Sequence, residues 1–289
     1  MKQINLFIQL TRLKKPIGFM LLFWPCAWGL TLAYDFSNIL NNYFFYLTLF
    51  FLGSVLMRSA GCIVNDIADK EFDKKVLRTK ERPIASDKIS IQLGLLYAAS
   101  LCILALLVLI NFNNLTIIIA LSSMPLAFSY PLMKRYTYWP QLFLGITFNY
   151  GLILGWVCIK NQIDFIPIIL YLGAIFWTLG FDTIYGFQDI KDDEIIGIKS
   201  TSIKFKKNPT LFLLLCYLLF TTSLFTVGFV MNFNIVFYLF MIIPVFHLFF
   251  YQLYKFNYKD PNNCFKIFKS NNFLGLLVLI NLLIGKIAL

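Results

Sequence analysis

The sequence contains few charged residues for its length. Only 13% of its 289 residues are Asp, Glu, Lys or Arg, whereas 59% are hydrophobic, and the mean hydropathy is +0.74. A soluble domain usually carries about 25% charged residues, so the composition excludes a soluble globular domain of this size. It predicts a chain that lies mostly within a lipid bilayer.

Histidine is almost absent, since His247 is the only one in the chain. A zinc or iron site built on imidazole ligands is therefore excluded. The six cysteines are scattered singly without a C-x-x-C pair, and we interpret them as small packing residues. We also expect no cleavable secretory signal, because residues 1–15 form a polar, basic arm ahead of the first apolar run.

Long apolar runs dominate the rest of the chain. A membrane-spanning helix needs about 20 predominantly apolar residues, and nine runs reach or approach that length. Their approximate bounds are 17–34, 43–64, 91–110, 115–132, 141–159, 165–187, 210–230, 234–254 and 272–289. The predicted fold is therefore all-α, a polytopic membrane protein with about nine transmembrane helices that form a single domain over residues 1–289.

Basic residues lie almost entirely on one side of these predicted spans. Of the 25 Lys and Arg residues, 22 fall in the N-terminal arm or in the connections 65–90, 133–140, 188–209 and 255–271. Because basic loops stay cytoplasmic, we predict a bacterial inner-membrane protein with a cytoplasmic N-terminus and a periplasmic C-terminus. The net charge of +11 then reflects topology rather than nucleic-acid binding, since no fold presents the dispersed basic residues to a nucleic acid.

Acidic residues gather in two segments on that same side. Eleven of the 14 Asp and Glu residues lie within 65–90 or 182–194. If each segment continues the preceding span as a helix, at about 100° per residue, the acids fall into two stripes. These stripes consist of Asn65, Asp69 and Asp73 in the first segment and of Asp182, Asp189 and Asp193 in the second. Glu71 and Glu194 lie off the stripes and are expected to be solvated.

Like charges stacked on one helix face repel one another unless a positive charge lies against them. Pairing with nearby basic residues would explain one cluster, but two one-sided clusters on the same membrane side favour a shared ligand. Carboxylate oxygens without His or Cys suit Mg²⁺, which binds one or two carboxylates together with phosphate oxygens and water. The pattern predicts a Mg²⁺–diphosphate site in a central cavity that opens at the cytoplasmic side, capped by the connections 65–90, 133–140 and 188–209.

Several basic residues could complete such a site. Arg58 lies within an apolar run two turns before Asn65, and a charge at that depth is expected to face a cavity with a partner. Other cations are expected to ring the cytoplasmic mouth, namely Arg78, Arg82, Lys134, Arg135 and Lys199. Arginine can bind diphosphate oxygens in bidentate fashion and lysine as a point charge. For each of these mouth residues, a role in topology alone stays open.

Three segments resemble the signature sequences of a known family. RSAGCIVNDIADKEFDKKVLRTKERPIAS (58–86), YPLMKRYTYWPQLFLG (130–145) and GFDTIYGFQDIKDDEIIGIKSTS (180–202) are similar to the UbiA superfamily of membrane-embedded aromatic prenyltransferases. The opening RLKKPIGFMLLFWPCAWGL (12–30) resembles its 4-hydroxybenzoate polyprenyltransferase branch, which acts in ubiquinone biosynthesis. The resemblance covers residues 12–205, and the last three spans are family-like only in being apolar.

The resemblance implies roles for individual residues. The first family motif, N-x-x-x-D-x-x-x-D, matches Asn65, Asp69 and Asp73, and the second, D-x-x-x-D, matches Asp189 and Asp193. Both would hold Mg²⁺ and act in catalysis. Asp66 and Asp182 stand at positions where the branch also has acidic residues. Arg58, Tyr130 and Lys134 match positions that in the family line the diphosphate and the reacting centre. Arg135 is a candidate for binding the benzoate carboxylate. Asp87 departs from the branch, which usually has a small residue there, often glycine.

The activity that the resemblance implies is prenyl transfer. A polyprenyl group would pass from polyprenyl diphosphate to the ring carbon ortho to the hydroxyl of 4-hydroxybenzoate, releasing diphosphate, without an obligate protein partner. The same chemistry on a naphthoate, a homogentisate or a haem stays open. An ion-coupled transporter is the alternative from another class, although transporters place their coupling carboxylates near the bilayer midplane, whereas these acids cluster at one interface.

Overall fold

The computed structural model describes residues 2–287, and every regular element in that range is a helix. Eight helical segments are long and apolar enough to cross a membrane. They are α3 (Leu40–Ala68), α5 (Ile91–Leu109), α6 with α7 (Asn114–Ser122 and Met124–Tyr136), α8 (Pro140–Lys160), α9 (Phe165–Gly186), α12 (Pro209–Val230), α13 with η1 (Ile235–Phe246 and His247–Leu253) and α14 (Pro261–Ile287). A further apolar helix, α2 (Ile17–Ala33), has 17 residues. The all-α prediction is confirmed, and the predicted number of nine spans is approximate.

Two helices extend well beyond the apolar runs that predicted them. Helix α3 continues to Ala68, and α14 begins at Pro261, whereas the corresponding run was expected to begin at residue 272. The predicted basic connection 255–271 is therefore largely helical. A hydropathy pattern detects only the apolar part of a helix. The first turns of α14 contain charged residues such as Lys269, whose ammonium lies 4.6 Å from the ring centre of Phe265. Residues 288 and 289 of the last predicted span lie outside the described residues.

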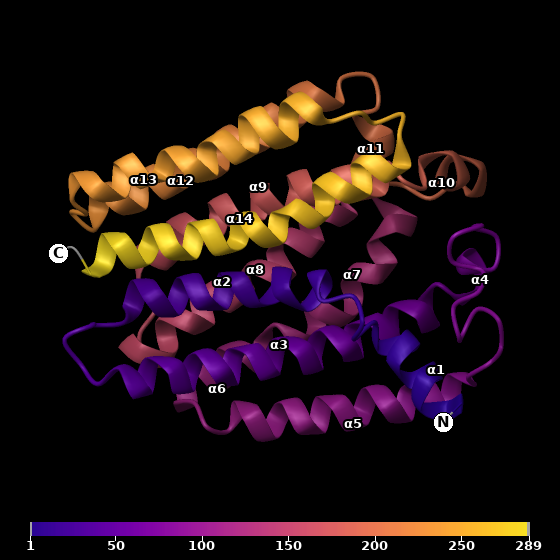
Figure 1. Ribbon diagram of the computed structural model, residues 1–289. Coiled ribbons are helices and arrows are strands. Elements are labelled where there is room, and N and C mark those ends of the chain that lie inside the picture. Colours follow the sequence, from indigo (N-terminus) through magenta and orange to yellow (C-terminus); the bar gives the residue numbers. More distant parts are fainter. Residues whose placement is uncertain (1, 288–289) are drawn as a thin grey trace.

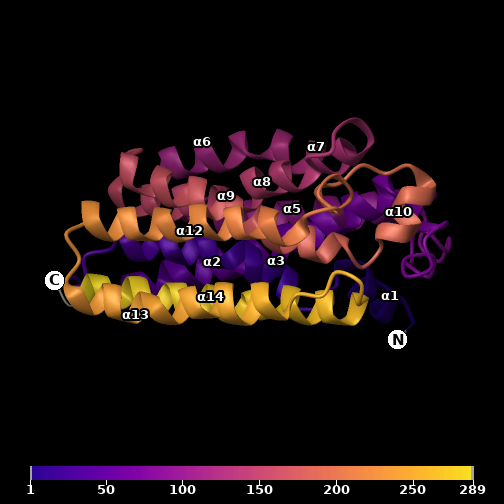
Figure 2. The ribbon, with the colours of Figure 1, turned by 90° about the horizontal axis from the view of Figure 1, so that it is seen from above.

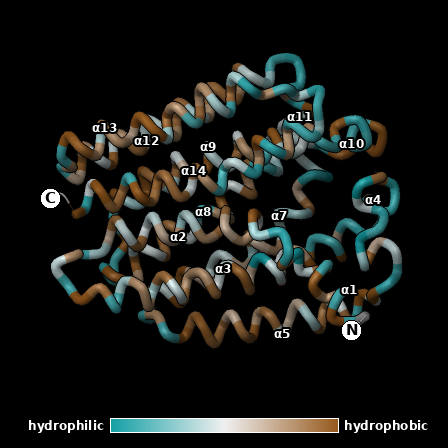
Figure 3. The backbone as a smooth tube through the Cα atoms, viewed as in Figure 1, coloured by the Kyte–Doolittle hydropathy of each residue, from teal (hydrophilic) through white to brown (hydrophobic). Residues whose placement is uncertain are grey.

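The spanning helices lie alongside one another, and the short helices gather at one end of the bundle (Figures 1 and 2). These short helices are α1 (Lys2–Thr11), α4 (Lys70–Asp73), α10 (Ile190–Ile196) and α11 (Thr201–Lys204). Hydrophilic residues concentrate at the same end, whereas the long helices are mostly hydrophobic (Figure 3). We call this the charged end of the bundle. The described chain starts there and finishes at the opposite end.

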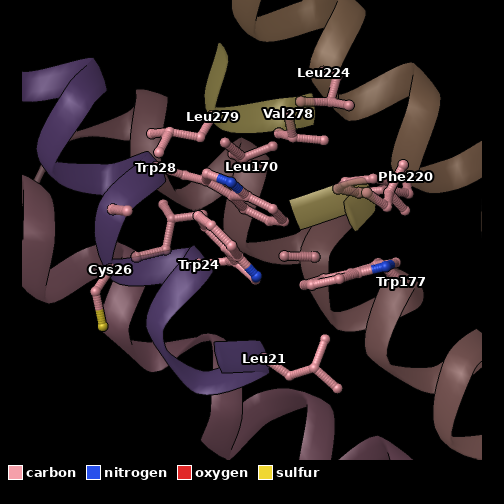
Figure 4. Packing of buried hydrophobic residues seen from close by; sticks show 14 of the residues in the cluster. Leu21, Trp24, Cys26, Trp28, Leu170, Trp177, Phe220, Leu224, Val278 and Leu279 are labelled. Carbon is pink, nitrogen blue, oxygen red and sulfur yellow. The ribbon is translucent and has the colours of Figure 1, made fainter. Parts of the chain in front are cut away.

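Close packing of α2 against α8 forms the centre of the bundle. A Cβ atom on Gly29 would lie 1.9 Å from the Leu152 carbonyl oxygen, and one on Gly155 would lie 2.3 Å from the Cys26 carbonyl oxygen. Only glycine permits helix backbones to approach so closely. Beside this contact the ring of Trp28 packs on that of Trp177 at 5.0 Å (Figure 4). Helices α3 and α9, which carry the acidic segments, pack against this central pair.

A hydrogen-bonded network joins the last spans within the bundle. The Tyr217 hydroxyl donates to Gln252 at 2.6 Å, and the Gln252 amide donates to Asn271 at 3.1 Å. Asn271 also accepts from the Trp177 indole at 2.8 Å. His247 lies beside this network, buried within the π-helical turn η1. Buried polar groups of a membrane protein need such partners because no water is available to them.

Candidate functional site

The first acidic segment lies where α3 leaves the bundle. Helix α3 ends at Ala68, and Asp69 has φ −98° and ψ 4° before α4 begins. The predicted uninterrupted helix is therefore broken at Asp69. The amides of Asp69 and Asp73 nevertheless donate to the carbonyls four residues earlier, at 2.9 and 2.8 Å. The side chains of Asn65, Asp69 and Asp73 thus keep a near-helical spacing across the break.

The second acidic segment repeats this geometry. Helix α9 ends at Gly186, and Asp189 has φ −112° and ψ 10° at the start of α10. The Asp193 amide donates to the Asp189 carbonyl at 2.9 Å. In both motifs, then, the first aspartate of D-x-x-x-D follows the break and the second lies one turn further on. The two segments reach the charged end as similar structural units.

Basic side chains pair with most of these carboxylates. Lys134 at the end of α7 contacts Asp69 at 2.5 Å, and Arg82 contacts Asp73 at 2.7 Å and Asp66 at 3.1 Å. The three aspartates are at most 6% exposed. A buried carboxylate is stable in its charged form only when it is paired. The sequence-predicted residues of the first motif and of α7 are therefore brought together at one place.

An arginine connects the two motifs directly. Arg78, which follows the first motif, donates from Nε to both carboxylate oxygens of Asp189, at 2.8 and 3.0 Å. Its Nη1 donates to the Tyr185 hydroxyl at 3.1 Å, and its guanidinium carbon lies 5.5 Å from the centre of that ring. This multidentate contact fixes both the position and the orientation of Asp189.

Two motif aspartates retain coordinating capacity. Oδ1 of Asp69 is buried and has no hydrogen-bond partner within the described chain, and burial raises the pKa of this carboxyl despite the ammonium of Lys134. Asp193 has no ion pair within residues 2–287. Burial, together with the negative charge of Asp189, raises the pKa of Asp193 to about 7. Both groups would be stabilised by an added positive charge.

The donor set fits a divalent hard cation. The motif side chains offer oxygen atoms without sulfur or imidazole, which is what Mg²⁺ selects. The buried Oδ1 of Asp69 has no hydrogen-bond partner within residues 2–287. Among the described residues, however, no three His, Cys, Asp or Glu side chains converge into a ligand group. Arg78, Arg82 and Lys134 hold three of the four motif aspartates in separate ion pairs.

An apolar cavity of about 420 Å³ lies within the bundle, lined mainly by α3, α5, α6, α7 and α8. One face of α3 lines it from Leu49 to Gly61, a length of about 18 Å at 1.5 Å per residue. Aromatic rings from three helices and from the connection between α5 and α6 contribute to its wall, namely those of Phe50, Phe112, Tyr130, Phe148 and Tyr150. Ile103 on α5 and Leu121 on α6 also line the cavity and are 61% and 49% exposed. We interpret this exposure as an opening of the cavity on the side of α5 and α6.

Arg58 and Tyr130 form the polar end of this cavity. The Arg58 guanidinium carbon lies 5.2 Å from the centre of the Phe148 ring, and its Nε is buried without a hydrogen-bond partner in the described chain. Asp182 on α9 lies within electrostatic reach of Arg58. A Cβ on Gly18 would lie 2.8 Å from Arg58 Nε, so α2 passes close to the guanidinium at this glycine. The prediction that Arg58 faces a cavity is consistent with this geometry.

A second, smaller cavity of about 270 Å³ lies at the charged end between α7 and residues 196–198. Lys134, Arg135 and Phe72 line it. The Arg135 Nη2 donates to the Ala68 carbonyl at 2.6 Å, and its guanidinium carbon lies 5.3 Å from the centre of the Phe72 ring. Lys199 resembles Arg135, because its ammonium donates to a backbone carbonyl, that of Tyr136 at 3.3 Å, and pairs with no motif carboxylate among the described residues.

Arg12 was not among the site residues predicted from the sequence. It has φ 57° between α1 and α2, and its Nη2 contacts Asp66 at 2.5 Å. The sequence offered one signal, since Arg12 is the first residue of the segment that resembles the polyprenyltransferase branch, but its charge was assigned to topology. Asp87, the departure from the branch, has φ 55°. A small residue, often glycine, suits that position because glycine adopts positive φ at no steric cost.

Comparisons with known proteins agree with this arrangement. The model of the UbiA prenyltransferase family matches residues 22–277. The 4-hydroxybenzoate polyprenyltransferase, mitochondrial, of Bos taurus is 40% identical over 282 residues, which cover 97% of this chain and 75% of the relative. The 4-hydroxybenzoate geranyltransferase 2 of Lithospermum erythrorhizon is 38% identical over 289 residues, which cover 99% of this chain and 92% of the relative.

Solved structures share the fold. A UbiA homologue from Aeropyrum pernix K1 superimposes with a TM-score of 0.72 at 19% identity, covering 92% of this chain and 97% of its own. A homologue from Archaeoglobus fulgidus, solved with GPP and Mg²⁺ bound, gives a TM-score of 0.70 at 17% identity. The superposition covers 97% of this chain and 99% of the homologue.

The prediction of a bacterial inner membrane is wrong. Relatives of 39–45% identity from Drosophila pseudoobscura pseudoobscura, Bos taurus, Homo sapiens and Arabidopsis thaliana are all named as mitochondrial enzymes. The positive-inside pattern reports which loops share one side of a membrane, and it carries no information about which membrane that is. The multi-pass architecture itself is consistent with the structure.

Proposed function

The chain belongs to the UbiA prenyltransferase family, and on that basis we propose that it transfers a polyprenyl group from polyprenyl diphosphate to 4-hydroxybenzoate in ubiquinone biosynthesis. The names of the relatives support the acceptor and a mitochondrial membrane as its location. The observation that carries the proposal is that an apolar cavity reaches Arg58 and Tyr130, and Arg58 lies on α3 two turns before Asn65, where the first acidic segment begins.

The motif side chains are the proposed metal ligands. Asn65, Asp69 and Asp73 would hold Mg²⁺ from the first segment, and Asp189 and Asp193 from the second. A UbiA homologue of the same fold binds GPP and Mg²⁺, which supports a divalent cation. When bound, the metal neutralises diphosphate charge and makes it a better leaving group. The buried, unpartnered Asp69 Oδ1 is the oxygen best placed to gain from it.

Basic side chains supply the rest of the diphosphate site. Arg78 and Arg82, on the connection after α4, and Lys134, on α7, pair with motif aspartates. Arg58 lies on α3 two turns before Asn65. Lys199 approaches from the connection before α11 and, through its amide, donates to the Lys134 carbonyl at 3.0 Å, which supports Lys134. Arginine and lysine stabilise phosphate oxygens in the bound substrate and in the departing group.

The apolar cavity is the proposed site of the prenyl tail. Its wall is aromatic and aliphatic, and the opening on the side of α5 and α6 lets a lipid-soluble chain enter from the bilayer. When the C–O bond to the diphosphate breaks, the electron pair leaves with the diphosphate and the allyl group becomes a carbocation. The faces of Tyr130 and Phe148 stabilise such a cation through their quadrupoles. The apolar wall excludes water, which would otherwise capture the cation.

The second cavity is the proposed approach of the acceptor. Within residues 2–287 Arg135 makes one hydrogen bond, to the Ala68 carbonyl, so other guanidinium N–H groups could bind a benzoate carboxylate. The ring carbon ortho to the hydroxyl attacks the allylic cation and forms the new C–C bond. The ring then loses its proton to a carboxylate, for which Asp182 and Asp66 are candidates, or to the released diphosphate.

Release of diphosphate tests this function. Membranes that contain the protein, given a polyprenyl diphosphate, 4-hydroxybenzoate and Mg²⁺, should release diphosphate in proportion to prenylated product. Omission of 4-hydroxybenzoate should abolish the product. An ion-coupled transporter would consume no prenyl diphosphate, so the absence of diphosphate release from well-inserted protein would contradict the proposal.

A further inference from the structure

The carboxylates proposed to bind metal are the same groups that hold basic side chains in this structure. Asp69 Oδ2 contacts Lys134, Asp73 Oδ2 contacts Arg82, and both oxygens of Asp189 accept from Arg78. A cation that binds through these same oxygens competes with the basic side chains for their lone pairs, although Oδ1 of Asp69 stays open to it. Metal and basic side chains therefore cannot bind independently of one another.

Displaced basic groups would not leave the site. Arg78 keeps a hydrogen bond to the Tyr185 hydroxyl at 3.1 Å, and its guanidinium carbon stays against the ring of Tyr185. The Lys134 ammonium lies 5.6 Å from the centre of the Phe72 ring. These second anchors do not involve a motif carboxylate. Each cation therefore stays at the charged end after it loses its aspartate.

A cation without its carboxylate in a partly buried place is unfavourable. Side-chain exposure is 22% for Lys134 and 41% for Arg78, so water solvates these groups only in part. A bound diphosphate has several anionic oxygens, which can accept hydrogen bonds from both Arg78 and Lys134. Binding of the metal and binding of the diphosphate then support each other, as linkage requires.

On the basis of the proposed function, we infer that Arg78 and Lys134 exchange partners, holding Asp189 and Asp69 until a divalent cation binds those carboxylates and then holding the diphosphate. The two side chains thus oppose binding of the metal alone and favour binding of the metal together with diphosphate. Such an exchange delays assembly of the charged site until both components are present.

Metal binding without turnover tests the exchange. The full-length protein, purified in detergent, would be titrated with Mn²⁺ alone and with Mn²⁺ plus inorganic diphosphate, and free Mn²⁺ would be followed by electron paramagnetic resonance. Arg78→Gln and Lys134→Met should each bind Mn²⁺ alone at least about fivefold more tightly than the wild type. In the wild type, diphosphate should increase the affinity for Mn²⁺. In the two variants this increase should be at least about fivefold smaller, because a charge-assisted hydrogen bond to diphosphate is lost.

The matched control is Lys80→Gln. Lys80 lies on the same connection as Arg78, is exposed and forms no ion pair within residues 2–287, so it tests the effect of removing one positive charge. Its affinity for Mn²⁺ should change less than twofold. Arg78→Lys keeps the charge but loses the fork geometry, and its values should fall between those of the wild type and Arg78→Gln. Thermal unfolding midpoints identify any variant that fails to fold, and Arg78→Lys then carries the test.

Two outcomes would contradict different statements. If the wild type binds Mn²⁺ with diphosphate but the Arg78 and Lys134 variants bind Mn²⁺ alone no more tightly than Lys80→Gln, the exchange is wrong and the proposed function stands. If the folded wild type binds no Mn²⁺ even with diphosphate, the metal site of the proposed function is wrong, and the exchange with it.

Discussion

Arg78 and Asp189, which are 111 residues apart in sequence, form the direct link between the two acidic segments. Arg78 follows the first motif, and Asp189 begins the second. Because the guanidinium also donates to Tyr185 at the end of α9, the connection after α4 is held against the second segment. The charged end is therefore closed by an ion pair between groups that we assign to substrate and metal binding.

Both acidic segments should be required for activity. Asp69→Asn or Asp189→Asn removes a carboxylate charge while the side-chain shape is kept. We expect either change to lower the rate of product formation by about 100-fold or more, since even loss of a group that only supports a metal ligand costs about 10- to 100-fold. The measurement is turnover per inserted protein in membranes.

Glu71→Gln provides the control for these two variants. Glu71 lies on α4 between the motif aspartates, but its side chain is 76% exposed, and its one ion pair within residues 2–287 is with Lys74. Its turnover should stay within twofold of the wild type. Near wild-type turnover of either aspartate variant would show that the two segments do not act on one substrate.

Metal removal should stop the reaction. EDTA should abolish product formation, and excess Mg²⁺ or Mn²⁺ should restore it, because the ligands are oxygen atoms that both ions accept. Zn²⁺ should restore less, since the site offers neither imidazole nor thiolate. Product formation that survives thorough chelation would mean that Lys and Arg side chains alone hold the diphosphate.

Filling the apolar cavity should affect the prenyl substrate alone. Gly53 lies on the α3 face that lines the cavity, and a Cβ there would meet no atom within 4 Å. Gly53→Phe should raise the KM for a long polyprenyl diphosphate about tenfold more than for geranyl diphosphate, because the added ring occupies the space of the tail. Gly53→Ala adds one methyl group to open space and should change neither value. Equal effects on both chain lengths would place the tail elsewhere.

Arg135 should govern the acceptor. Arg135→Lys keeps the charge but loses bidentate geometry and stacking on Phe72. We expect the KM for 4-hydroxybenzoate to rise about tenfold, since a charge-assisted hydrogen bond contributes about 1.5–3 kcal/mol, with the KM for prenyl diphosphate unchanged. Phenol, which lacks the carboxylate, should be a poor acceptor for the wild type and no worse for the variant. If instead the KM for prenyl diphosphate rises and the KM for 4-hydroxybenzoate does not, Arg135 binds the diphosphate.

Sequence patterns predicted the features that depend on a single helix, namely the lengths of the spans and the spacing of side chains along one face. The thickness of the bilayer sets the length of an apolar helix, which is why the spans were found, and the 3.6-residue period placed Asn65, Asp69 and Asp73 on one stripe. The polar start of α14 was missed because hydropathy does not detect helix outside lipid. The pattern could not separate the cavity face of α3 from its lipid face, since both are apolar.

The ion pairs of the charged end were beyond sequence reasoning for another reason. Whether Lys134 meets Asp69, or Arg12 meets Asp66, depends on how α1, α3 and α7 pack in three dimensions. A positive charge near a membrane surface satisfies the topology rule equally well whether it faces water or a buried carboxylate. Arg12 was therefore interpreted as a topology signal until the structure placed it against Asp66.

The identity of the prenylated product tests the proposed function most directly. Membranes containing the protein would be given one polyprenyl diphosphate, Mg²⁺ and a panel of aromatic acceptors that includes 4-hydroxybenzoate, a dihydroxynaphthoate and homogentisate, with products identified by mass spectrometry. The proposed function predicts a product only from 4-hydroxybenzoate, with the prenyl group on the ring carbon ortho to the hydroxyl. A product formed preferentially from the naphthoate or from homogentisate would contradict it.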